Sequence, residues 1–219
     1  MKKINVITID GPSASGKGAL ARGIANKFNF NILDSGVLYR LYAYLSKMSF
    51  SSDEIANQIE GYVEFKKNKE KLLVSYKSTD VTSELRSEII AKSASEHSSK
   101  KEVREALFNI QRNFYDGGGL VADGRDMGTV VFKDAKLKIF LTATPEVRAK
   151  RRYIELQNRK QEVNMPALID DIKQRDLSDS TRDISPLLPA DDAHIIDSSD
   201  MSLEEVFSYA ENLIRKEFI

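Results

Sequence analysis

The chain has no cysteine and no tryptophan, and it has only two histidines and five prolines among 219 residues. The absence of cysteine excludes disulfide bonds and thiolate metal centres, and it fits a reducing compartment. An excess of either charge is also missing, because 33 Lys and Arg residues balance 33 Asp and Glu residues. No overall field therefore draws the chain toward nucleic acid or an anionic membrane, and any binding of phosphate must be local.

Long apolar runs are missing as well. No apolar stretch approaches the roughly 18 residues that a membrane-spanning helix needs. The start, MKKINVITIDG, has two lysines before a short apolar run, as a secretory signal does, but this run is too short and leads directly into glycine. We interpret it as a buried strand. We expect a cytoplasmic protein with neither a membrane nor a nucleic acid as its partner.

Short apolar runs alternate with helical periodicities in a chain that is 41% hydrophobic and 30% charged. A chain of this length can bury one substantial core. The apolar runs suit strands that are buried on both faces, and they lie at residues 5–9, 31–33, 119–122, 137–143 and 193–197. Strands that alternate with helices predict an α/β fold with a parallel, five-stranded sheet and right-handed crossovers.

Helical spacing marks three of the segments between or after these strands. The apolar positions of the first two are Leu20, Ile24 and Phe28, and then Val103, Leu107, Ile110 and Phe114. The glycines at 117–119 are expected to stop the second of these helices. Ser202 and Glu205 have the spacing of a capping box, which predicts the start of a last helix.

Residues 62–81 break this alternation. Their β-branched and aromatic residues surround the polar sequence KKNKE, which predicts a small antiparallel hairpin or meander inserted on the main sheet. The sequence RKQEVN, at residues 159–164, is the most charged loop, and we expect it to form a mobile flap at the surface.

The stretch IDGPSASGKGAL, at residues 9–20, joins a strand end, a glycine-rich turn and a helix start. Gly11, four further residues and then Gly16-Lys17 match the phosphate-binding loop. Its backbone N–H groups and the positive end of the helix would surround an anion, and Lys17 would reach the β- and γ-phosphates of a nucleotide. A simple tight turn from strand to helix would show the same pattern. Gly18 stands where the general pattern has a hydroxyl that binds Mg²⁺.

The sequence LDSGVLYR, at residues 33–40, offers a second anion site. Ser35 or Asp34 could simply cap the helix that follows, although a cap can also contact a ligand. Arg40 would lie about one helical turn further on, where a second anionic group could be bound. A solvated surface charge is the alternative role for Arg40.

The sequence DGRDMGTVVF, at residues 123–132, follows an apolar strand. Asp123, Arg125 and Asp126 should therefore lie near the carboxyl edge of the sheet, where open α/β sheets bind ligands. Asp123 is a candidate to hold Mg²⁺ through water, and Arg125 suits an acceptor phosphate. The alternative is a loop in which Asp and Gly serve the turn and Arg pairs with Asp.

Two further stretches place charged residues at helical spacing. Arg175, Asp179 and Arg182 of RDLSDSTR would share one face of a helix, as they also would in an ordinary ladder of ion pairs. Thr144 and Pro145 mark another helix start. The arginines that follow, and that would share a face, are Arg148, Arg151 and Arg152. A solvated charged face is the ordinary role of such a run.

These motifs, taken in order from DGPSASGKG to SPLLPADDAHIIDSS at residues 185–199, closely resemble bacterial cytidylate kinases over nearly the whole chain. The resemblance implies a P-loop kinase of the nucleoside monophosphate kinase family, which uses ATP with Mg²⁺ to convert CMP and dCMP to CDP and dCDP. Ala19 departs from the family, which usually has a threonine that contacts a nucleotide phosphate at this position.

The resemblance also implies how one domain, residues 1–219, is divided. The core would comprise residues 1–36, 102–147 and 166–219, with an NMP-binding region at about 37–101 and a lid at about 148–165. We expect this protein to be a monomer.

The resemblance assigns site residues to both nucleotides. Those expected to bind ATP are Gly11, Pro12, Ser13, Ala14, Ser15, Gly16, Lys17, Gly18 and Ala19, with Arg148, Arg151 and Arg152 of the lid. Those expected to bind CMP are Ser35, Arg40, Ser95, Arg104, Arg125, Asp126, Arg175, Asp179 and Arg182. Lys17, Asp123, Arg125 and Arg182 are the residues expected to act in catalysis.

Choice of the base needs an acceptor for the cytosine amino group and a donor for its N3 atom. Asp126 and Arg104 meet these needs. Arg104 and Ser95, a further base contact, come from SASEHSSKKEVREAL, which resembles the family's segment after the insert. Both could instead be exposed helix residues.

A dedicated catalytic base is not evident in the sequence. A nucleoside monophosphate attacks through a phosphate oxygen that is already ionised near neutral pH, so none is needed. His97 and His194 are expected to be structural or exposed. Two other functions remain open: a P-loop kinase for another small acceptor, such as UMP or a metabolite hydroxyl, and a non-catalytic module that senses ATP. The second set of charged residues argues against the sensing module.

Overall fold

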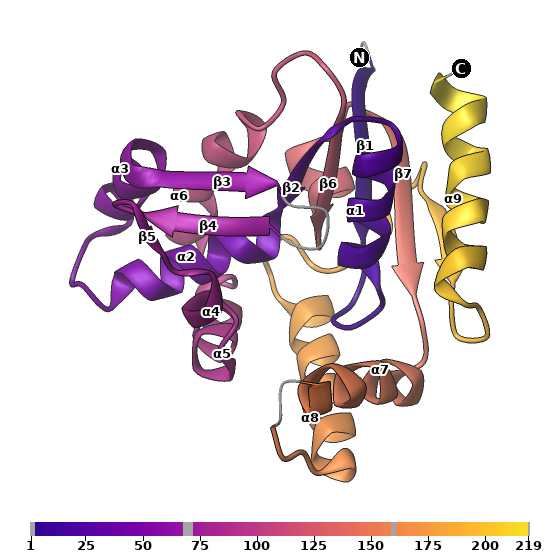
Figure 1. Cartoon of the computed structure of the whole chain (residues 1–219). Coiled ribbons are helices and arrows are strands. Elements are labelled where there is room, and N and C mark those ends of the chain that lie inside the picture. The colour runs from indigo at the N-terminus through magenta and orange to yellow at the C-terminus, as the bar shows by residue number, and fades with distance from the viewer. Residues whose placement is uncertain (1–2, 68–71, 159–160, 219) are drawn as a thin grey trace.

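The computed structural model describes residues 3–67, 72–158 and 161–218. At its centre is a parallel sheet of five strands in the order β2-β6-β1-β7-β8 (Figure 1). The strands are β1 (Ile4–Asp10), β2 (Asn31–Asp34), β6 (Leu120–Gly124), β7 (Ala135–Thr142) and β8 (His194–Asp197). The predicted strands and their parallel arrangement are confirmed.

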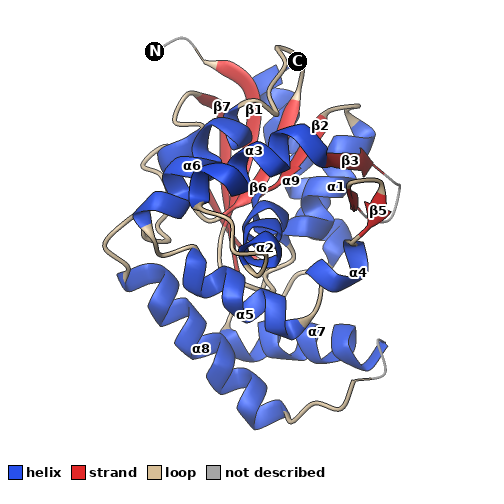
Figure 2. Ribbon diagram, turned by 90° about the vertical axis from the view of Figure 1, so that its left-hand side faces the viewer, coloured by secondary structure: helices blue, strands red, loops and turns tan. Residues whose placement is uncertain are grey.

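Helices cover both faces of this sheet (Figures 1 and 2). On one face, α1 (Lys17–Lys27) and α9 (Leu203–Phe218) pack with Ile7 and Ile9 of β1. On the other face, α2 (Ser35–Ser46) and α6 (Lys101–Arg112) pack with Val6 of the same strand. Because successive side chains of a strand point to opposite faces, one apolar strand contributes to both clusters.

The edge strand β8 corrects one prediction. The sequence suggested burial on both faces, but three of its four residues are exposed, and Ile195 keeps 61% of its surface accessible. The strand pairs only with β7, so it lies at the rim of the sheet, where less protein covers it. β2 is the other edge strand, and it too is incompletely buried.

The predicted insert is confirmed as a small antiparallel sheet. It follows α3 (Ser52–Tyr62) and contains β3 (Val63–Lys67), β4 (Leu72–Tyr76) and β5 (Thr79–Asp80). The turn expected at KKNKE falls mainly on residues 68–70, which lie outside the described residues. The chain continues through α4 (Thr82–Leu85) and α5 (Glu88–His97) into α6.

The helix boundaries follow local signals in most places. Ser202 Oγ accepts the Glu205 N–H at 3.2 Å, and Glu205 Oε2 accepts the Ser202 N–H at 2.8 Å, which confirms the capping box of α9. α6 ends at Arg112, before the glycines that were expected to stop it, so Phe114 lies beyond the helix. Within residues 3–67, 72–158 and 161–218, no helix has the length and apolar character required to cross a membrane.

Two further helices and a short π-helix lie between β6 and β8 in the sequence. α7 (Pro145–Asn158) and α8 (Met165–Thr181) lie below the main sheet in Figure 1 and pack against each other. The flap predicted at 159–164 begins with two residues that lie outside the described part, and 161–164 are neither helix nor strand. The π-helix η1 (Met127–Val131) begins three residues after the end of β6.

Candidate active site

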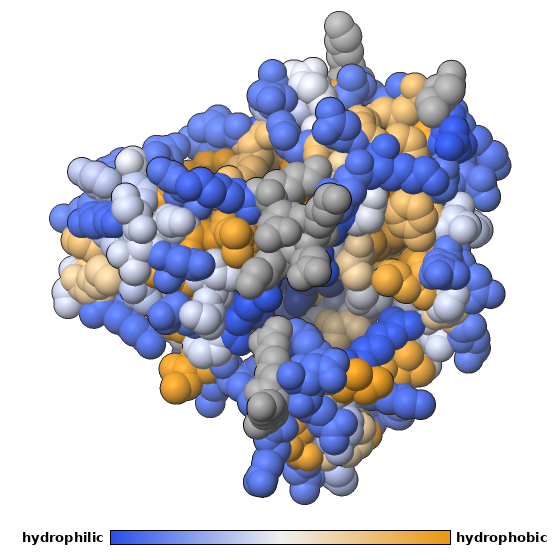
Figure 3. All heavy atoms as spheres, in the orientation of Figure 1, coloured by the Kyte–Doolittle hydropathy of each residue, from blue (hydrophilic) through white to orange (hydrophobic). Residues whose placement is uncertain are grey.

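A cleft of about 380 Å³ opens at the carboxyl ends of β1, β2 and β6. Its walls come from the phosphate-binding loop, from the insert with α4 and α5, and from α7 and α8. Figure 3 shows a hollow between these three parts of the molecule, with hydrophilic residues around it. Open parallel sheets bind ligands at this edge because the loops that follow their strands converge there.

The loop between β1 and α1 has the backbone that a phosphate site requires. A Cβ atom at Gly11 would lie 2.0 Å from the carbonyl oxygen of Leu141, so only glycine fits. Gly16 has φ +99°, and Ala14 adopts the left-handed region at φ 59°, which is uncommon for a residue with a side chain. Of the loop residues predicted to bind ATP, those lining the cleft are Ser13, Ala14, Lys17 and Gly18. Those outside its lining are Gly11, Pro12, Ser15, Gly16 and Ala19.

Lys17 begins α1 and is buried, and its Nζ donates a hydrogen bond to the Pro12 carbonyl at 2.7 Å. Burial and the cation of Arg125 lower the pKa of Lys17, while the carboxylates of Asp123 and Asp10 oppose this shift. A phosphate beside Lys17 would act in the same direction as these carboxylates and favour the ammonium form.

Asp123 is the second-last residue of β6, and its side chain is buried. Burial raises the pKa of this carboxyl group, and Lys17 counteracts that effect. Within the described residues, the side chain of Asp123 forms no hydrogen bond and no ion pair, although its backbone belongs to the sheet. A Cβ atom at Gly18 would lie 3.4 Å from Asp123 Oδ2, so the carboxylate faces the start of α1.

This donor set fits Mg²⁺, which commonly takes one or two carboxylates together with phosphate oxygens and several waters. The described ranges contain no group of three or more His, Cys, Asp or Glu side chains that could hold a metal ion by themselves. Asp123 would therefore hold Mg²⁺ together with nucleotide phosphates rather than in a cage of protein ligands.

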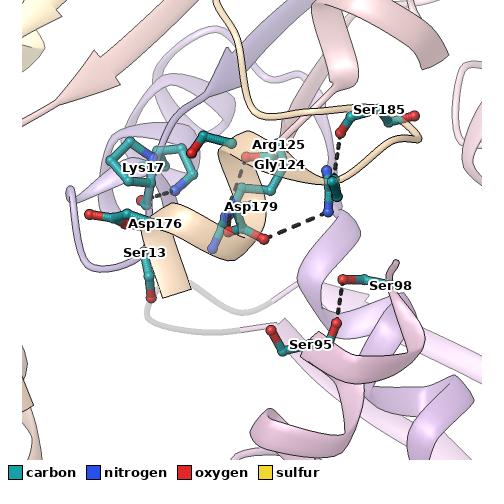
Figure 4. Close-up of polar contacts among 12 residues, drawn as sticks. Ser13, Lys17, Ser95, Ser98, Gly124, Arg125, Asp176, Asp179 and Ser185 are labelled. Atoms are coloured by element: carbon teal, nitrogen blue, oxygen red, sulfur yellow. Dashed lines mark hydrogen bonds and ion pairs between the residues drawn. The ribbon is translucent and has the colours of Figure 1, made fainter. Parts of the chain in front are cut away.

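Arg125, Asp179 and Arg182 form a cluster across the cleft from Lys17. Arg125 Nε donates to Asp179 Oδ2 at 2.9 Å, and Arg182 Nη1 lies 3.6 Å from Asp179 Oδ1. Burial alone would lower the pKa of Arg125, but the carboxylate of Asp179 keeps this pKa above its ordinary value. In Figure 4, Arg125 and Asp179 lie between Lys17 on one side and Ser95 and Ser98 on the other.

The cluster has more positive charge than its carboxylate can balance. Burial and repulsion by Arg125 lower the pKa of Arg175 to about 10. Arg182 Nη2 is buried and has no hydrogen-bond partner among the described residues. Arg175 and Asp179 share a face of α8 as predicted, whereas Arg182 follows the helix, which ends at Thr181. This surplus suits an anionic group.

Arg104 and Asp126 meet at another wall of the cleft. Their side chains are buried and form an ion pair between Arg104 Nη2 and Asp126 Oδ2. Arg104 Nη1 also donates to the Ser98 carbonyl at 2.9 Å, and its guanidinium lies 5.6 Å from the centre of the Tyr39 ring. Ser95 of α5 lines the same wall. These three predicted base contacts are therefore brought together, and none is an exposed helix residue.

Either Asp34 or Ser35 could cap α2 according to the sequence, and the structure distinguishes them. Asp34 Oδ1 accepts the Val37 N–H at 3.1 Å, so Asp34 is the cap. Ser35 instead donates to Gln111 Oε1 at 3.3 Å, and Arg40 donates to the Leu85 carbonyl at 3.2 Å. Both Ser35 and Arg40 line the cleft, and burial lowers the pKa of Arg40.

The three arginines of α7 differ in the groups that they contact. Arg148 is buried and bonded to Asp176 and to the carbonyls of Ala143 and Ser13, and Arg151 donates to the Ser15 carbonyl at 3.1 Å. These two arginines therefore brace the outside of the phosphate-binding loop. Arg152 alone of the three lines the cleft, where it pairs with Glu155 and with Glu88 of α5.

One protein family matches almost the whole chain. The family model for cytidylate kinase matches residues 7–216.

This chain belongs to the cytidylate kinase family.

Curated relatives support the assignment over nearly the full length. The chain is 43% identical over 213 residues to the cytidylate kinase of Stutzerimonas stutzeri, covering 94% of this chain and 93% of the relative. It is also 43% identical over 218 residues to the cytidylate kinase of Photorhabdus laumondii, covering 96% of this chain and 95% of the relative. The predicted family and the prediction of a nucleoside monophosphate kinase are confirmed.

Solved structures agree on the fold. An uncharacterized protein from Eubacterium ventriosum has a TM-score of 0.51 at 15% identity over 98% of this chain and 97% of its own. A protein from Thermus thermophilus has a TM-score of 0.50 at 13% identity over 100% of both chains. At such low identity, the likeness concerns the fold alone.

Two residues that line the cleft, Tyr39 and Arg22, and one buried acid behind it were not predicted from the sequence. The acid is Asp10, which ends β1 and does not line the cleft. Its carboxylate accepts the N–H groups of Met127 and Gly128 at 2.8 Å each. Burial raises the pKa of Asp10 to about 7. An acidic residue at the end of a buried strand was a visible signal for Asp10, whereas only the packing of α1 and α2 brings Arg22 and Tyr39 to the cleft.

Proposed function

We propose that this family member transfers the γ-phosphoryl group of ATP to CMP and dCMP and forms ADP with CDP or dCDP. The observation that carries the proposal is the pairing of two cationic sets in one cleft. Lys17 and the phosphate-binding loop form one wall, and Arg125, Arg175 and Arg182 form another. The membership of the cytidylate kinase family supports the same activity.

The donor side binds the phosphates of ATP. The N–H groups of the loop and the amino end of α1 attract the anion, and Lys17 would neutralise charge on the transferred group. Ser13, Ala14 and Gly18 come closest to such a ligand because they line the cleft. Arg152 is the α7 arginine that can reach it directly, while Arg148 and Arg151 hold the loop from behind.

Mg²⁺, held by Asp123 through water and by the nucleotide phosphates, would neutralise phosphate charge when bound.

The acceptor side must bring one anion against another. The monophosphate attacks through an oxygen that is already ionised near neutral pH, so repulsion between the two nucleotides is the main obstacle. Arg40, Arg125 and Arg182 would neutralise the acceptor phosphate and align it with the donor. Arg175 and Asp179 would lie at the sugar of the acceptor, as the family resemblance implies. Asp179 holds Arg125 in place through the 2.9 Å bond to its Nε atom.

The base would be selected by Asp126, Arg104 and Ser95. An ionised Asp126 accepts a hydrogen bond from the cytosine amino group and repels the carbonyl oxygen that uracil has there. Arg104 can donate to N3 of cytosine, where uracil has an N–H group. Their ion pair orients both side chains at the wall of the cleft.

The test is a coupled ADP-release assay with CMP, dCMP, UMP and a panel of other acceptors. The proposal requires turnover with CMP and dCMP well above that with UMP. Preference for UMP or for a metabolite hydroxyl would instead support a kinase for another acceptor, and ATP binding without any turnover would support a sensing module.

Substitution of Asp126 tests the base contact itself. Asp126→Asn replaces one acceptor oxygen by a donor amide, so the ratio of the specificity constants for CMP and UMP should fall at least about tenfold, or about 1.4 kcal/mol. Asp183→Asn, at an exposed position, is the control and should leave this ratio unchanged. An unchanged ratio in Asp126→Asn would exclude Asp126 as a base contact.

We also propose the division of the chain that the family resemblance implies. Residues 1–36, 102–147 and 166–219 would form the core, about 37–101 the NMP-binding region, and about 148–165 the lid. The antiparallel sheet of the insert and the turn between α7 and α8 support these positions. A cytoplasmic monomer remains our expectation, and light scattering of the purified protein would test the oligomeric state.

A further inference from the structure

Ser185 accepts hydrogen bonds from two arginines of the cleft. Its hydroxyl oxygen accepts from Arg104 Nε at 3.2 Å, and its carbonyl oxygen accepts from Arg182 Nε at 2.6 Å. Arg104 comes from α6, whereas Arg182 directly follows α8. Ser185 therefore joins the base wall of the cleft to the phosphate cluster. Figure 4 shows Ser185 on the side of Asp179 that lies away from Lys17.

The backbone of Ser185 adopts a costly conformation to do this. Its φ of 50° lies in the left-handed region, which residues with a side chain seldom occupy. The next residue is Pro186, and proline favours an extended conformation in the residue before it. Leu187 holds the loop in this form, because its side chain is buried and its N–H donates to the Asp179 carbonyl at 2.7 Å. A strained backbone that the surroundings maintain often marks a functional position.

The loop at Ser185 lies between two cations that repel each other. Burial lowers the pKa of Arg182, and repulsion by Arg104 lowers it further, so the two buried cations lie close enough to repel each other. Each oxygen of Ser185 faces one of these cations. An oxygen that accepts a hydrogen bond from a cation stabilises its charge and fixes its direction.

The orientation of Arg104 depends on three bonds. Nη2 pairs with Asp126, Nη1 donates to the Ser98 carbonyl at 2.9 Å, and Nε donates to the Ser185 hydroxyl. The plane of a guanidinium is fixed when bonds hold more than one of its edges. Ser185 supplies the bond at the Nε edge, and its side chain supplies nothing to Arg182, which binds the carbonyl oxygen instead.

We propose that Ser185 is a positioning residue for selection of the base: its hydroxyl holds Arg104 in the orientation that reads cytosine. This inference rests on the proposed function. Removing the hydroxyl should loosen Arg104 while the backbone contact to Arg182 remains, so selection of the base should suffer and phosphate binding should not.

The experiment compares Ser185→Ala and Ser185→Gly, which both lack the hydroxyl. In both, the ratio of specificity constants for CMP and UMP should fall at least about threefold, the scale of one lost hydrogen bond, through a higher KM for CMP. The kcat with CMP and the KM for ATP should stay within about twofold, because the phosphate contacts remain. Ser180→Ala, at an exposed position of α8, is the matched control and should match the unsubstituted protein.

Thermal melting separates this role from a merely conformational one. Glycine tolerates a positive φ and alanine does not, so Ser185→Gly should melt no lower than Ser185→Ala. Equal losses of base selection in both variants support the inference, whatever their stabilities. Selection that survives in Ser185→Gly, or in both variants, overturns it while leaving the proposed function intact. Absence of a cytosine preference in the unsubstituted protein overturns the proposed function itself and this inference with it.

Discussion

Lys17 is the residue on which phosphoryl transfer should depend most. It is buried at the start of α1, and its ammonium group reaches across the loop to the Pro12 carbonyl at 2.7 Å. Lys17→Met keeps the length and apolar stem of the side chain but removes the charge. The specificity constant should fall at least about a hundredfold, as for other groups that stabilise transition-state charge. A coupled ADP-release assay measures this loss.

The control for this prediction is Lys101→Met, because Lys101 is exposed on α6. It should retain the activity of the unsubstituted protein. Circular dichroism should show that Lys17→Met is folded, since replacing a buried cation removes a desolvation cost. Near-normal turnover by folded Lys17→Met would contradict the role of this loop in catalysis.

Asp192 gives a prediction of pH dependence at the residue scale. It accepts bonds from Lys3 at 2.8 Å and from Lys138 at 2.7 Å. Although partial burial opposes the shift, the two lysines lower the pKa of Asp192 from 3.8 to about 2. Its stabilising contribution is therefore complete above about pH 5 and is lost as the pH falls toward 2.

Asp192→Asn tests this contribution. Because Asp192 is half exposed, the free energy of unfolding at pH 7 should fall by about 1 kcal/mol or less. The difference from the unsubstituted protein should shrink as the pH falls below about 4, and urea titrations at several pH values measure it. Asp191→Asn, at the neighbouring exposed position, should show no such difference. A difference of constant size between pH 3 and pH 7 would argue against the ion pairs as its cause.

At the scale of elements, one ion pair links α7 with α5 at the mouth of the cleft. Arg152 of α7 pairs with Glu88 of α5, and it also pairs with Glu155 of its own helix. Under the proposed function, these carboxylates would compete with nucleotide phosphates for Arg152, the only α7 arginine that lines the cleft among the described residues. A nucleotide that binds Arg152 would therefore have to share this arginine with Glu88 or break the ion pair between α7 and α5.

Glu88→Gln should weaken this competition. We expect the KM for ATP to fall by about twofold, the scale of one ion pair whose carboxylate is largely exposed, with little change in stability. Steady-state kinetics at saturating CMP measure the change. Glu84→Gln, an exposed acid of α4 that does not line the cleft, serves as the control. A higher KM for ATP in Glu88→Gln would mean that the pair helps to hold Arg152 for binding.

At the scale of the whole molecule, the cleft is enclosed by three parts that are far apart in the sequence. The loop before α1, the insert with α4 and α5, and the α7–α8 pair all contribute to its lining. A ligand that contacts all three would bind only the folded chain and would stabilise it by mass action.

A bisubstrate analogue, in which five phosphates join adenosine to cytidine, should therefore raise the melting temperature more than an ATP analogue or CMP does at equal concentration. At one hundred times its dissociation constant, the gain would be about 2.7 kcal/mol. Differential scanning fluorimetry measures the shifts, and an analogue with uridine in place of cytidine is the control for the base. Equal shifts with the bisubstrate analogue and with CMP alone would contradict a shared cleft.

Sequence by itself determined the five parallel strands, the inserted hairpin and the phosphate-binding loop. These features follow from local causes: apolar runs of strand length, turn residues between them, and the spacing of Gly11, Gly16 and Lys17 in one turn. The capping box of α9 was also visible, because both of its partners lie within one helical turn.

Only the tertiary structure decided which charged residues share the cleft. Arg148, Arg151 and Arg152 look alike in the sequence, yet the first two bind carbonyls behind the loop and the third faces the cleft. Helical spacing fixes which residues share a face, but the packing of α7 fixes where that face points. Ser185 accepts a hydrogen bond from Arg104, which lies 81 residues away in the sequence, and no local pattern could relate the two. Contacts between distant residues exist only once the strands and helices have packed.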